Sequence, residues 1–306
     1  MIFEEEKSKI DFLFEEKGVQ VYIKREDLLH EHISGNKFRK LKYNILEAKR
    51  LKKETILTFG GAFSNHITAT AYAGKLYNFN TIGIIRGEEL GKDLQKTLAK
   101  NDSLKFAREQ GMRFKFIERK TYREKTTVKF IEALKKEFGA FYLVPEGGTN
   151  ELAIKGCEEI MQKEDEKFDY ICVAVGTGGT ISGIINSANK NQQILGFSVL
   201  KGTFLQKEIK QKCPNVQNWS LINDYHFGGF AKINEELVHF MNAFYKEYRL
   251  KLDPIYTGKM MFGIIDLIKK GYFKKGTKIV AIHTGGLQGI KAMNKRLDKK
   301  GLSLIV

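Results

Sequence analysis

The chain has 306 residues, 42% of them hydrophobic and 29% charged, which is the composition of an ordinary globular protein with one large α/β unit or two lobes around a cleft. No apolar run approaches the roughly 20 residues that a membrane helix needs, and the acidic start at 1–7 has no apolar signal region, so we expect a cytoplasmic protein without a membrane partner. The formal net charge of +16 would suit a nucleic-acid binder, but the Lys and Arg residues are interspersed with acids and form no basic tail. We therefore expect no nucleic-acid partner.

Cysteine usage excludes two further classes. The three cysteines form no CxxC pair and have no histidine at metal-ligand spacing, so neither a disulfide framework nor a metal site is expected. Cys172 lies within the apolar run 170–175, which indicates a buried structural thiol.

Strand-like runs alternate with helical periodicity almost throughout the chain. In chain order the expected elements are strand 55–59, helix 64–77, strand 81–85, helix 92–110, strand 114–117, helix 126–138, strand 141–144, helix 152–163, strand 170–175, a helix from 180, strand 194–200, helices 234–248 and 259–271, and strand 278–282. This alternation predicts an α/β fold with parallel-rich open sheets covered by helices on both faces. Ligands of such sheets bind at the carboxyl ends of the strands.

Three of these strands end in glycine-rich turns that are expected to open helices, at 60–66, 176–180 and 283–286. The strongest phosphate candidate is Gly176-Thr177-Gly178-Gly179-Thr180, where backbone N–H groups and two hydroxyls would meet the positive end of the following helix. It is neither a Walker A loop nor a GxGxxG fingerprint, which disfavours a dinucleotide. A purely structural turn remains the alternative for this segment taken alone.

A lysine-rich helix start, Gly35-Asn36-Lys37-Phe38-Arg39-Lys40-Leu41-Lys42, precedes the first of these strands. Most such lysines face solvent. A lysine that forms an imine needs neighbouring cations or desolvation to lower its pKa, and Arg39, Lys40 and Lys42 could supply the cations.

At this point the sequence resembles the pyridoxal-phosphate (PLP) enzymes of the tryptophan-synthase-β fold (fold type II), in the branch of D-cysteine desulfhydrase and 1-aminocyclopropane-1-carboxylate (ACC) deaminase. The matching segments keep the family's order over about nine-tenths of the chain: Lys24-Arg25-Glu26-Asp27, Gly35-Asn36-Lys37 with Arg39-Lys40-Leu41, Ser64-Asn65-His66, Gly176-Thr177-Gly178, the run from Leu252 to Lys259, and His283-Thr284-Gly285-Gly286. The resemblance implies a two-lobed enzyme with a small domain at 52–144 and a large PLP-binding domain formed by 1–51 and 145–306.

The resemblance also implies roles for individual residues. Lys37 carries PLP as a Schiff base and moves the Cα proton, with Ser64, Tyr225 and Tyr256 as further catalytic candidates. The expected cofactor-binding residues are Asn36, Lys37, Lys40, Asn65 (to the phenolic oxygen), Gly176, Thr177, Gly178, Gly179, Thr180, Thr257 and Thr284. The expected substrate-binding residues are Ser64, Asn65 and His66, which would hold the carboxylate at a helix start, with Tyr225 and Tyr256.

Three positions depart from one branch or the other. The deaminase branch has Glu directly after its second tyrosine, where this chain has Thr257, and it usually has Gln where His66 stands. With Thr284 as another neutral group, a less fully protonated cofactor ring is expected, which suits β-elimination. Phe63 stands where the desulfhydrase branch commonly has Gln, so the pocket could be smaller or favour a different side chain.

The leading interpretation is therefore a PLP-dependent lyase that releases sulfide from D-cysteine, or from a related small amino acid, and yields pyruvate and ammonia. The alternative within the fold is ACC deamination to 2-oxobutyrate and ammonia. Two other classes remain as rivals: a PLP-binding protein with little turnover and a basic nucleic-acid-binding protein. The family resemblance also implies a homodimer.

Overall fold

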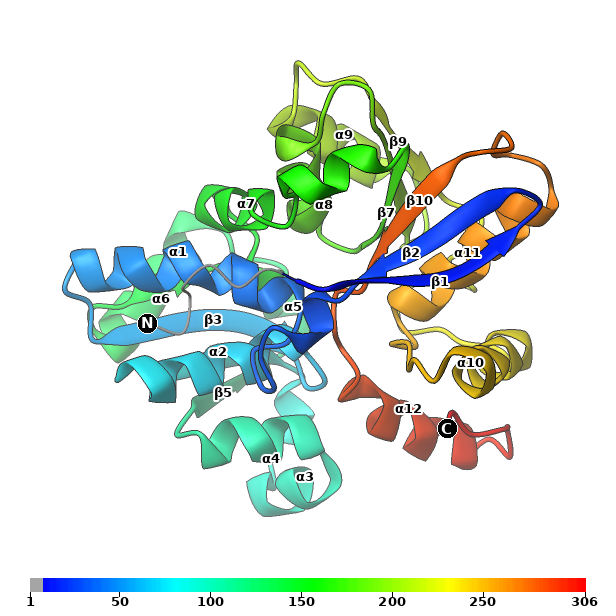
Figure 1. Cartoon of the computed structure of the whole chain (residues 1–306). Coiled ribbons are helices and arrows are strands. Elements are labelled where there is room, and N and C mark those ends of the chain that lie inside the picture. The colour runs from blue at the N-terminus through cyan, green and yellow to red at the C-terminus, as the bar shows by residue number, and fades with distance from the viewer. Residues whose placement is uncertain (1–7) are drawn as a thin grey trace. The chain divides into compact units, whose positions relative to one another are not determined.

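The computed structural model describes residues 8–306, which form two compact units (Figure 1). One unit contains residues 8–39 together with Ile154–Val306, and the other is Lys40–Ala153. The second unit extends beyond the expected 52–144 at both ends, because most of the helix before its first strand and the turn after its last strand belong to it.

The first unit is built on a six-stranded sheet with the order β1-β2-β10-β7-β8-β9. The strands are β1 (Ile10–Glu16), β2 (Val19–Lys24), β10 (Lys278–Ile282), β7 (Tyr170–Val175), β8 (Gln193–Ser198) and β9 (Trp219–Ile222). All neighbouring pairs are parallel except the hairpin β1–β2, whose Lys17 and Gly18 both adopt left-handed backbone angles in the connecting turn.

Side chains along the central strands point alternately to the two faces of the sheet and so contribute to two hydrophobic layers. In β7, Cys172 and Ala174 pack with α10 (Glu235–Tyr248), α11 (Thr257–Lys269) and α12 (Gly289–Asp298). Ile171, Val173 and Val175 of the same strand pack on the other face with α8 (Gly179–Ser187) and α9 (Phe204–Lys212). The parallel core strands are therefore buried on both sides, as the sequence predicts.

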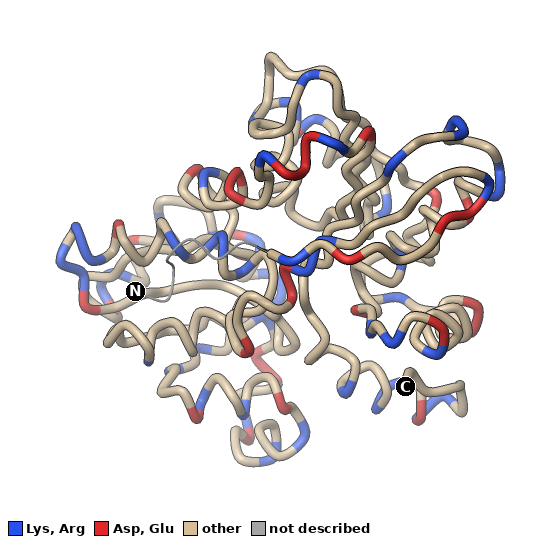
Figure 2. The backbone as a smooth tube through the Cα atoms, viewed as in Figure 1, with Lys and Arg blue, Asp and Glu red and all other residues tan. Residues whose placement is uncertain are grey.

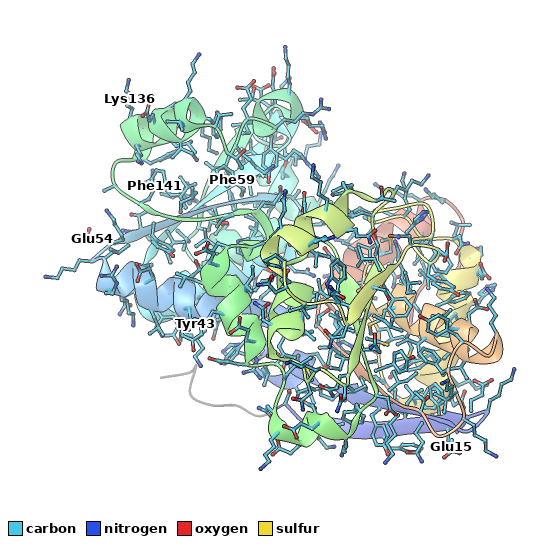
Figure 3. All side chains as sticks on the ribbon, turned by 90° about the horizontal axis from the view of Figure 1, so that it is seen from above. Glu15, Tyr43, Glu54, Phe59, Lys136 and Phe141 are labelled. Atoms are coloured by element: carbon cyan, nitrogen blue, oxygen red, sulfur yellow. The ribbon has the colours of Figure 1, made fainter. Side chains whose placement is uncertain are left out.

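The second unit is built on an all-parallel sheet with the order β5-β4-β3-β6. Its strands are β5 (Arg113–Ile117), β4 (Asn80–Arg86), β3 (Thr55–Gly61) and β6 (Tyr142–Val144), and its helices include α2 (Asn65–Tyr77), α3 (Leu94–Lys100), α4 (Asp102–Glu109), α5 (Arg119–Tyr122) and α6 (Val128–Phe138). Helices α2 and α4 share one hydrophobic layer, and α5 and α6 share the other. Phe59 and Phe141 belong to the α6 layer, whereas Lys136 of the same helix points away from it (Figure 3).

The chain crosses between the units within α1 (Asn36–Arg50) and α7 (Glu151–Glu158). In α1 the buried side chains Phe38, Leu41, Ile45 and Ala48 recur at the spacing of one helix face. Lys37 and the segment before it are thereby fixed at the start of a helix.

Some elements differ from the sequence-based expectation. The helix expected at 92–110 is two helices, because Asn101 has extended backbone angles and its side chain accepts a hydrogen bond from Leu104 N–H as the N-cap of α4. The helix expected at 152–163 ends at Glu158. The expectation did not include α9, β9, α12 or the β1–β2 hairpin.

Charged residues of both signs alternate along both units (Figure 2). The three cysteines are free and buried, as predicted for Cys172. Within residues 8–306, no helix is long and apolar enough to cross a membrane.

Candidate active site

The glycine-rich turn after β7 presents backbone donors at the start of α8. Gly178 precedes the helix with a left-handed φ of 77°, and no side chain caps this end. The N–H groups of Gly179, Thr180 and Ile181 therefore have no acceptor within the helix. Together with the helix dipole they can bind an anion such as a phosphate, which is the role predicted for this turn.

Asn36 links Lys37 to this turn. Its side-chain amide donates to Thr180 Oγ1 over 2.8 Å, and its Oδ1 accepts from Lys37 Nζ over 3.0 Å. Thr180 Oγ1 keeps its own hydrogen for a further acceptor. The structure thus brings Asn36, Lys37 and Thr180 together, and their predicted contacts with the cofactor stay a prediction.

The turn after β10 lies directly against the segment before Lys37. A Cβ atom on Gly35 would lie 2.0 Å from Thr284 O, and one on Gly285 would lie 2.5 Å from Ser34 Oγ. Both glycines have left-handed angles, so no other residue fits without moving the backbone. His283 fixes this turn: its Nδ1 accepts from Gly285 N–H, Nε2 bonds to Lys251 O, and burial lowers its pKa, which favours the neutral ring. The sequence predicted that this turn opens a helix, but α12 begins only at Gly289.

Tyr256 reaches the glycine turn from α11. A Cβ atom on Gly176 would lie 3.1 Å from Tyr256 Cε1 and 3.3 Å from its hydroxyl, so only glycine leaves the ring in place. The backbone of Tyr256 is held by Asp253, whose Oδ1 accepts from the N–H groups of Ile255 and Tyr256. Burial raises the pKa of Asp253 to about 7.

Thr257 is fully buried, and its hydroxyl accepts from Asp253 N–H over 2.7 Å. Thr284 is 8% exposed. Both are neutral, and each hydroxyl retains a hydrogen that it can donate. Their predicted place beside the cofactor ring stays a prediction.

Tyr225 has a different environment. Its hydroxyl donates to Asp266 Oδ2 over 2.7 Å, and the same carboxylate pairs with Lys270 at 2.6 Å. Burial and this hydrogen bond raise the pKa of Tyr225. Its ring packs near Phe197 and Phe262, and the structure records no contact from it to Lys37 or Tyr256 among the residues it describes. The catalytic role expected of Tyr225 therefore gains no support from these contacts.

Two of the cations expected around Lys37 have partners of their own. Arg39 is 3% exposed and forms a two-pronged ion pair with the fully buried Glu26. The ammonium of Lys42 lies 5.3 Å from the ring centre of Tyr43. The environment of Lys37 is thus shaped more by Asn36 than by Arg39.

In the four-stranded unit, the turn after β3 opens α2 with Ser64 as N-cap. Ser64 Oγ accepts from Ile67 N–H at 3.4 Å, and the N–H groups of Asn65 and His66 have no acceptor within the helix. A Cβ atom on Gly60 would lie 2.5 Å from Ile67, which explains the glycine before this turn. The side-chain amide of Asn65 forms no hydrogen bond with another described residue and remains available to a ligand.

His66 and Lys40 both contact the turn after β6. The His66 ring is 1% exposed, and its Nε2 donates to Thr58 Oγ1, because that hydroxyl already donates to Val144 O. Lys40 Nζ donates to Gly147 O and Thr149 Oγ1. A substrate carboxylate could therefore use the backbone N–H of His66, and the predicted phosphate contact of Lys40 stays a prediction.

The residues of the six-stranded unit fit a PLP cofactor. Lys37 supplies the primary amine, the start of α8 supplies donors for a phosphate, and Thr257 or Thr284 could meet the ring nitrogen. Sequence reasoning assigned no role to Asp253, Asp266 or the ring of His283. Asp253 lies inside the quoted motif, and an Asp followed by a Pro is a typical turn signal.

Comparison with known proteins gives the family of the chain. The model of the family "Pyridoxal-phosphate dependent enzyme" matches residues 7–285. The chain is 33% identical to the bifunctional D-cysteine desulfhydrase/ACC deaminase of Arabidopsis thaliana, described as mitochondrial, over 89% of this chain and 74% of that protein. It is 25% identical to a D-cysteine desulfhydrase of Serratia proteamaculans, over 94% and 93%.

A crystal structure of an ACC deaminase homologue superposes with a TM-score of 0.81 and 29% identity, over 96% of this chain and 93% of that one. This likeness confirms the predicted α/β fold with two largely parallel sheets. The chain belongs to the family of pyridoxal-phosphate dependent enzymes, in the group that contains ACC deaminases and D-cysteine desulfhydrases.

Proposed function

We propose that the protein eliminates sulfide from D-cysteine, or from a closely related small amino acid, to give pyruvate and ammonia. When bound, PLP supplies an aldehyde that condenses with amino groups and a ring that withdraws electrons from Cα. The residues of this chain then have to hold the cofactor, orient the amino acid and move protons.

Lys37 is the proposed base. Asn36 Oδ1 holds its Nζ at 3.0 Å and thereby limits the directions in which the amine can point. When Nζ takes the proton from Cα, the Cα electrons form a double bond to Cβ, and the bond from Cβ to sulfur breaks with its electron pair on the leaving thiolate. Addition of water to the released unsaturated amino acid gives pyruvate and ammonia.

The substrate carboxylate is proposed to bind the N–H groups at the start of α2, where Asn65 and His66 have no helical acceptor. Ser64 could donate its hydroxyl hydrogen to the same group, since its oxygen already accepts from Ile67 N–H. The side-chain amide of Asn65 is proposed to bind the phenolic oxygen of the cofactor.

The observation that carries the choice of elimination is the neutral, buried Thr257 in the position after Tyr256. A carboxylate there would keep the ring nitrogen protonated, and the ring would withdraw electrons more strongly. A hydroxyl leaves the ring a weaker electron sink. This suffices for a good leaving group such as thiolate and is less suited to opening an unactivated cyclopropane ring.

The test is release of sulfide and pyruvate by the PLP-loaded protein from D-cysteine, with L-cysteine and ACC as parallel substrates. We expect sulfide from the D isomer alone. Formation of 2-oxobutyrate from ACC without sulfide from D-cysteine would replace this proposal with the deaminase. If neither substrate reacts although the cofactor is bound, a binding protein with little turnover is favoured.

A homodimer is proposed on the family resemblance alone, and sedimentation of the purified chain would test it.

A further inference from the structure

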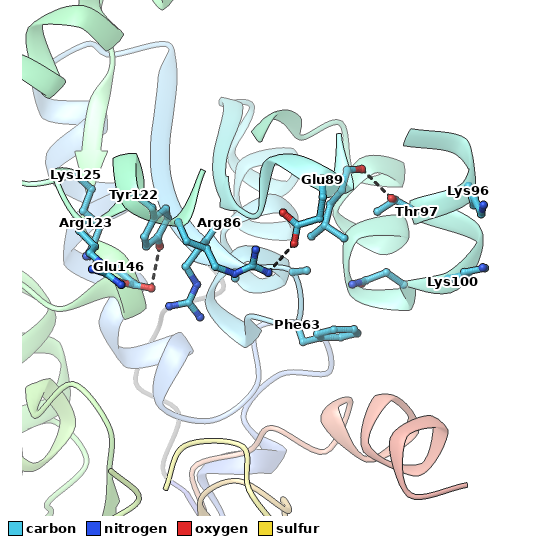
Figure 4. A pocket seen from close by; sticks show the side chains of 15 residues that line it. Phe63, Arg86, Glu89, Lys96, Thr97, Lys100, Tyr122, Arg123, Lys125 and Glu146 are labelled. Atoms are coloured by element: carbon cyan, nitrogen blue, oxygen red, sulfur yellow. Dashed lines mark hydrogen bonds and ion pairs between the residues drawn. The ribbon is translucent and has the colours of Figure 1, made fainter. Parts of the chain in front are cut away.

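A cavity of about 710 Å³ opens in the four-stranded unit, at the carboxyl end of its sheet (Figure 4). Its floor includes Gly61 at the end of β3 and Arg86 at the end of β4. Ligands of parallel sheets bind at this edge, and the volume falls in the range of roughly 300–1,000 Å³ that is usual for small-molecule sites. The cavity is larger than an amino acid the size of cysteine needs.

The lining is strongly cationic. It contains two carboxylates, Glu89 and Glu146, and six basic side chains: Arg86, Lys96, Lys100, Arg119, Arg123 and Lys125. Arg119 pairs with Glu89 at 2.6 Å, and Lys125 pairs with Glu146 at 3.3 Å. The remaining four basic side chains form no ion pair with any described residue.

Arg86 is held in place by its neighbours. Its guanidinium carbon lies 5.7 Å from the ring centre of Tyr122, and that ring is buried with its hydroxyl bonded to Glu146 at 2.8 Å. An Nη atom of Arg86 lies 3.7 Å from the point where a Gly61 Cβ would be, so the glycine keeps space beside the guanidinium open. A cation fixed over an aromatic ring is positioned before a ligand arrives.

The cations stand on two sides of the cavity. Figure 4 shows Arg123 and Lys125 on one side, Lys96 and Lys100 on the opposite side, and Arg86 between them. Phe63, whose ring is 52% exposed, adds apolar surface to the lining. This spacing suits an elongated ligand with an anionic group at each end.

We propose that this cavity binds a small molecule with at least two anionic groups, phosphoryl or carboxylate. Charge-assisted hydrogen bonds from Arg86 and Arg123 would hold one group, and Lys96 with Lys100 would hold the other. The site does not depend on D-cysteine being the substrate.

The test is calorimetric titration of the PLP-loaded full chain with inorganic tripolyphosphate and, separately, with citrate, at constant ionic strength. Saturating PLP keeps the glycine turn after β7 from binding the probe. We expect one site per chain for at least one probe, and the stronger probe tells whether phosphoryl or carboxylate groups are preferred.

Arg86→Gln and Lys100→Gln should each weaken binding about tenfold, the usual effect of losing a hydrogen bond to a charged group. The matched control is Arg108→Gln, which removes an exposed arginine on α4 outside the cavity and should change the dissociation constant less than about twofold. Lys100→Gln leaves the packing of Tyr122 intact and therefore tests the site even where Arg86→Gln perturbs folding.

Absence of binding by both probes at millimolar concentration would overturn the proposal. So would equal binding by the wild type, the two cavity variants and the Arg108 control, since that result indicates general attraction to a basic surface. If binding is found, kinetic competition with D-cysteine would indicate that the cavity extends the substrate pocket. Non-competitive behaviour would indicate a separate ligand.

Discussion

The carboxyl ends of the two sheets differ in whether their charged and polar side chains have hydrogen-bond or ion-pair partners. In the six-stranded unit, Lys37, Asn36 and Thr180 are joined by hydrogen bonds, and Arg39 is neutralised by Glu26. In the four-stranded unit, Arg86 has an aromatic ring beside it but no carboxylate partner in the described chain. Connected groups of the first kind are preorganised for chemistry, whereas uncompensated charges of the second kind suit the capture of an ionic ligand.

Because of this difference, catalysis and anion binding can be tested with separate variants. Loss of a residue in the hydrogen-bonded site should reduce the chemical step, and loss of a cation from the cavity should reduce anion binding. The variants below therefore probe the contrast from the largest expected effect to the smallest.

The largest effect is expected from Lys37→Ala. Without the amine, the covalent link to the cofactor and the proposed base are both lost, so turnover should fall by about a thousandfold or more, together with the visible absorption of the covalently held cofactor. Lys42→Ala is the matched control, because Lys42 lies on the same helix with its ammonium over Tyr43. Full turnover by the Lys37 variant would remove the basis for treating this unit as the catalytic one.

The two tyrosines should respond differently to removal of the hydroxyl. Tyr256→Phe takes a polar group from beside Gly176, and we expect kcat to fall by about a hundredfold with little loss of stability. Tyr225→Phe breaks the bond to Asp266 and should lower the free energy of unfolding by about 1 kcal/mol or less, with a smaller effect on kcat. Steady-state kinetics would measure the change in kcat of both variants, and urea unfolding would measure the change in stability. A larger kcat loss for Tyr225→Phe than for Tyr256→Phe would restore the predicted catalytic role of Tyr225.

These sites were predictable from sequence to different degrees. The glycine turn and the serine N-cap lie in short contiguous motifs at strand ends, where local chemistry selects them. The lysine lies at a helix start, and its role came from the family resemblance. The partner of Tyr225 was not selected, since Asp266 lies 41 positions from Tyr225 and meets it only through the packing of α11. Tertiary contacts of that range leave no local pattern.

The fold, too, was predicted from the sequence only in part. Apolar runs predicted the parallel core strands, because those strands are buried on both faces. The β1–β2 hairpin was missed although Lys17-Gly18 separates two strand-like runs, a pattern typical of a tight turn. The cavity was missed for another reason: its cations come from β4, α3, α5 and the segment after α5, and in a lysine-rich chain none of them stands out.

A smaller effect, on the pH dependence of stability, is expected from Asp253→Asn. Burial raises the pKa of Asp253 to about 7 from an ordinary value of 3.8, and its Oδ2 has no hydrogen-bond partner among the residues described. Between these two values the folded protein keeps a proton that the unfolded chain releases. The contribution of this carboxyl is therefore fully present below about pH 4 and is lost as the pH rises to about 7.

Asparagine does not ionise and can still accept from Ile255 and Tyr256 N–H through Oδ1. The stability of the variant relative to the wild type should rise between pH 4 and 7 and then level, by about 1.4 kcal/mol per unit of pKa shift. His283, whose pKa is lowered, contributes in the opposite direction but is the same in both proteins, so its contribution cancels in the difference. A pH-independent difference in urea unfolding would mean that Asp253 ionises normally, and that this end of α11 is solvated like the cavity of the other unit.

The smallest expected effect is a gain of anion binding from Glu89→Gln. Glu89 pairs with Arg119 on the exposed rim of the cavity, and the pair competes with any anion for that guanidinium. Removing the negative charge should tighten tripolyphosphate or citrate binding by roughly two- to threefold at low salt, because exposed ion pairs are weak. Added salt should reduce this gain, since both the pair and the ligand contacts are screened. Unchanged or weaker binding would mean that Arg119 does not face the ligand, and that the ligand is held by Arg86, Arg123 and the two lysines of α3.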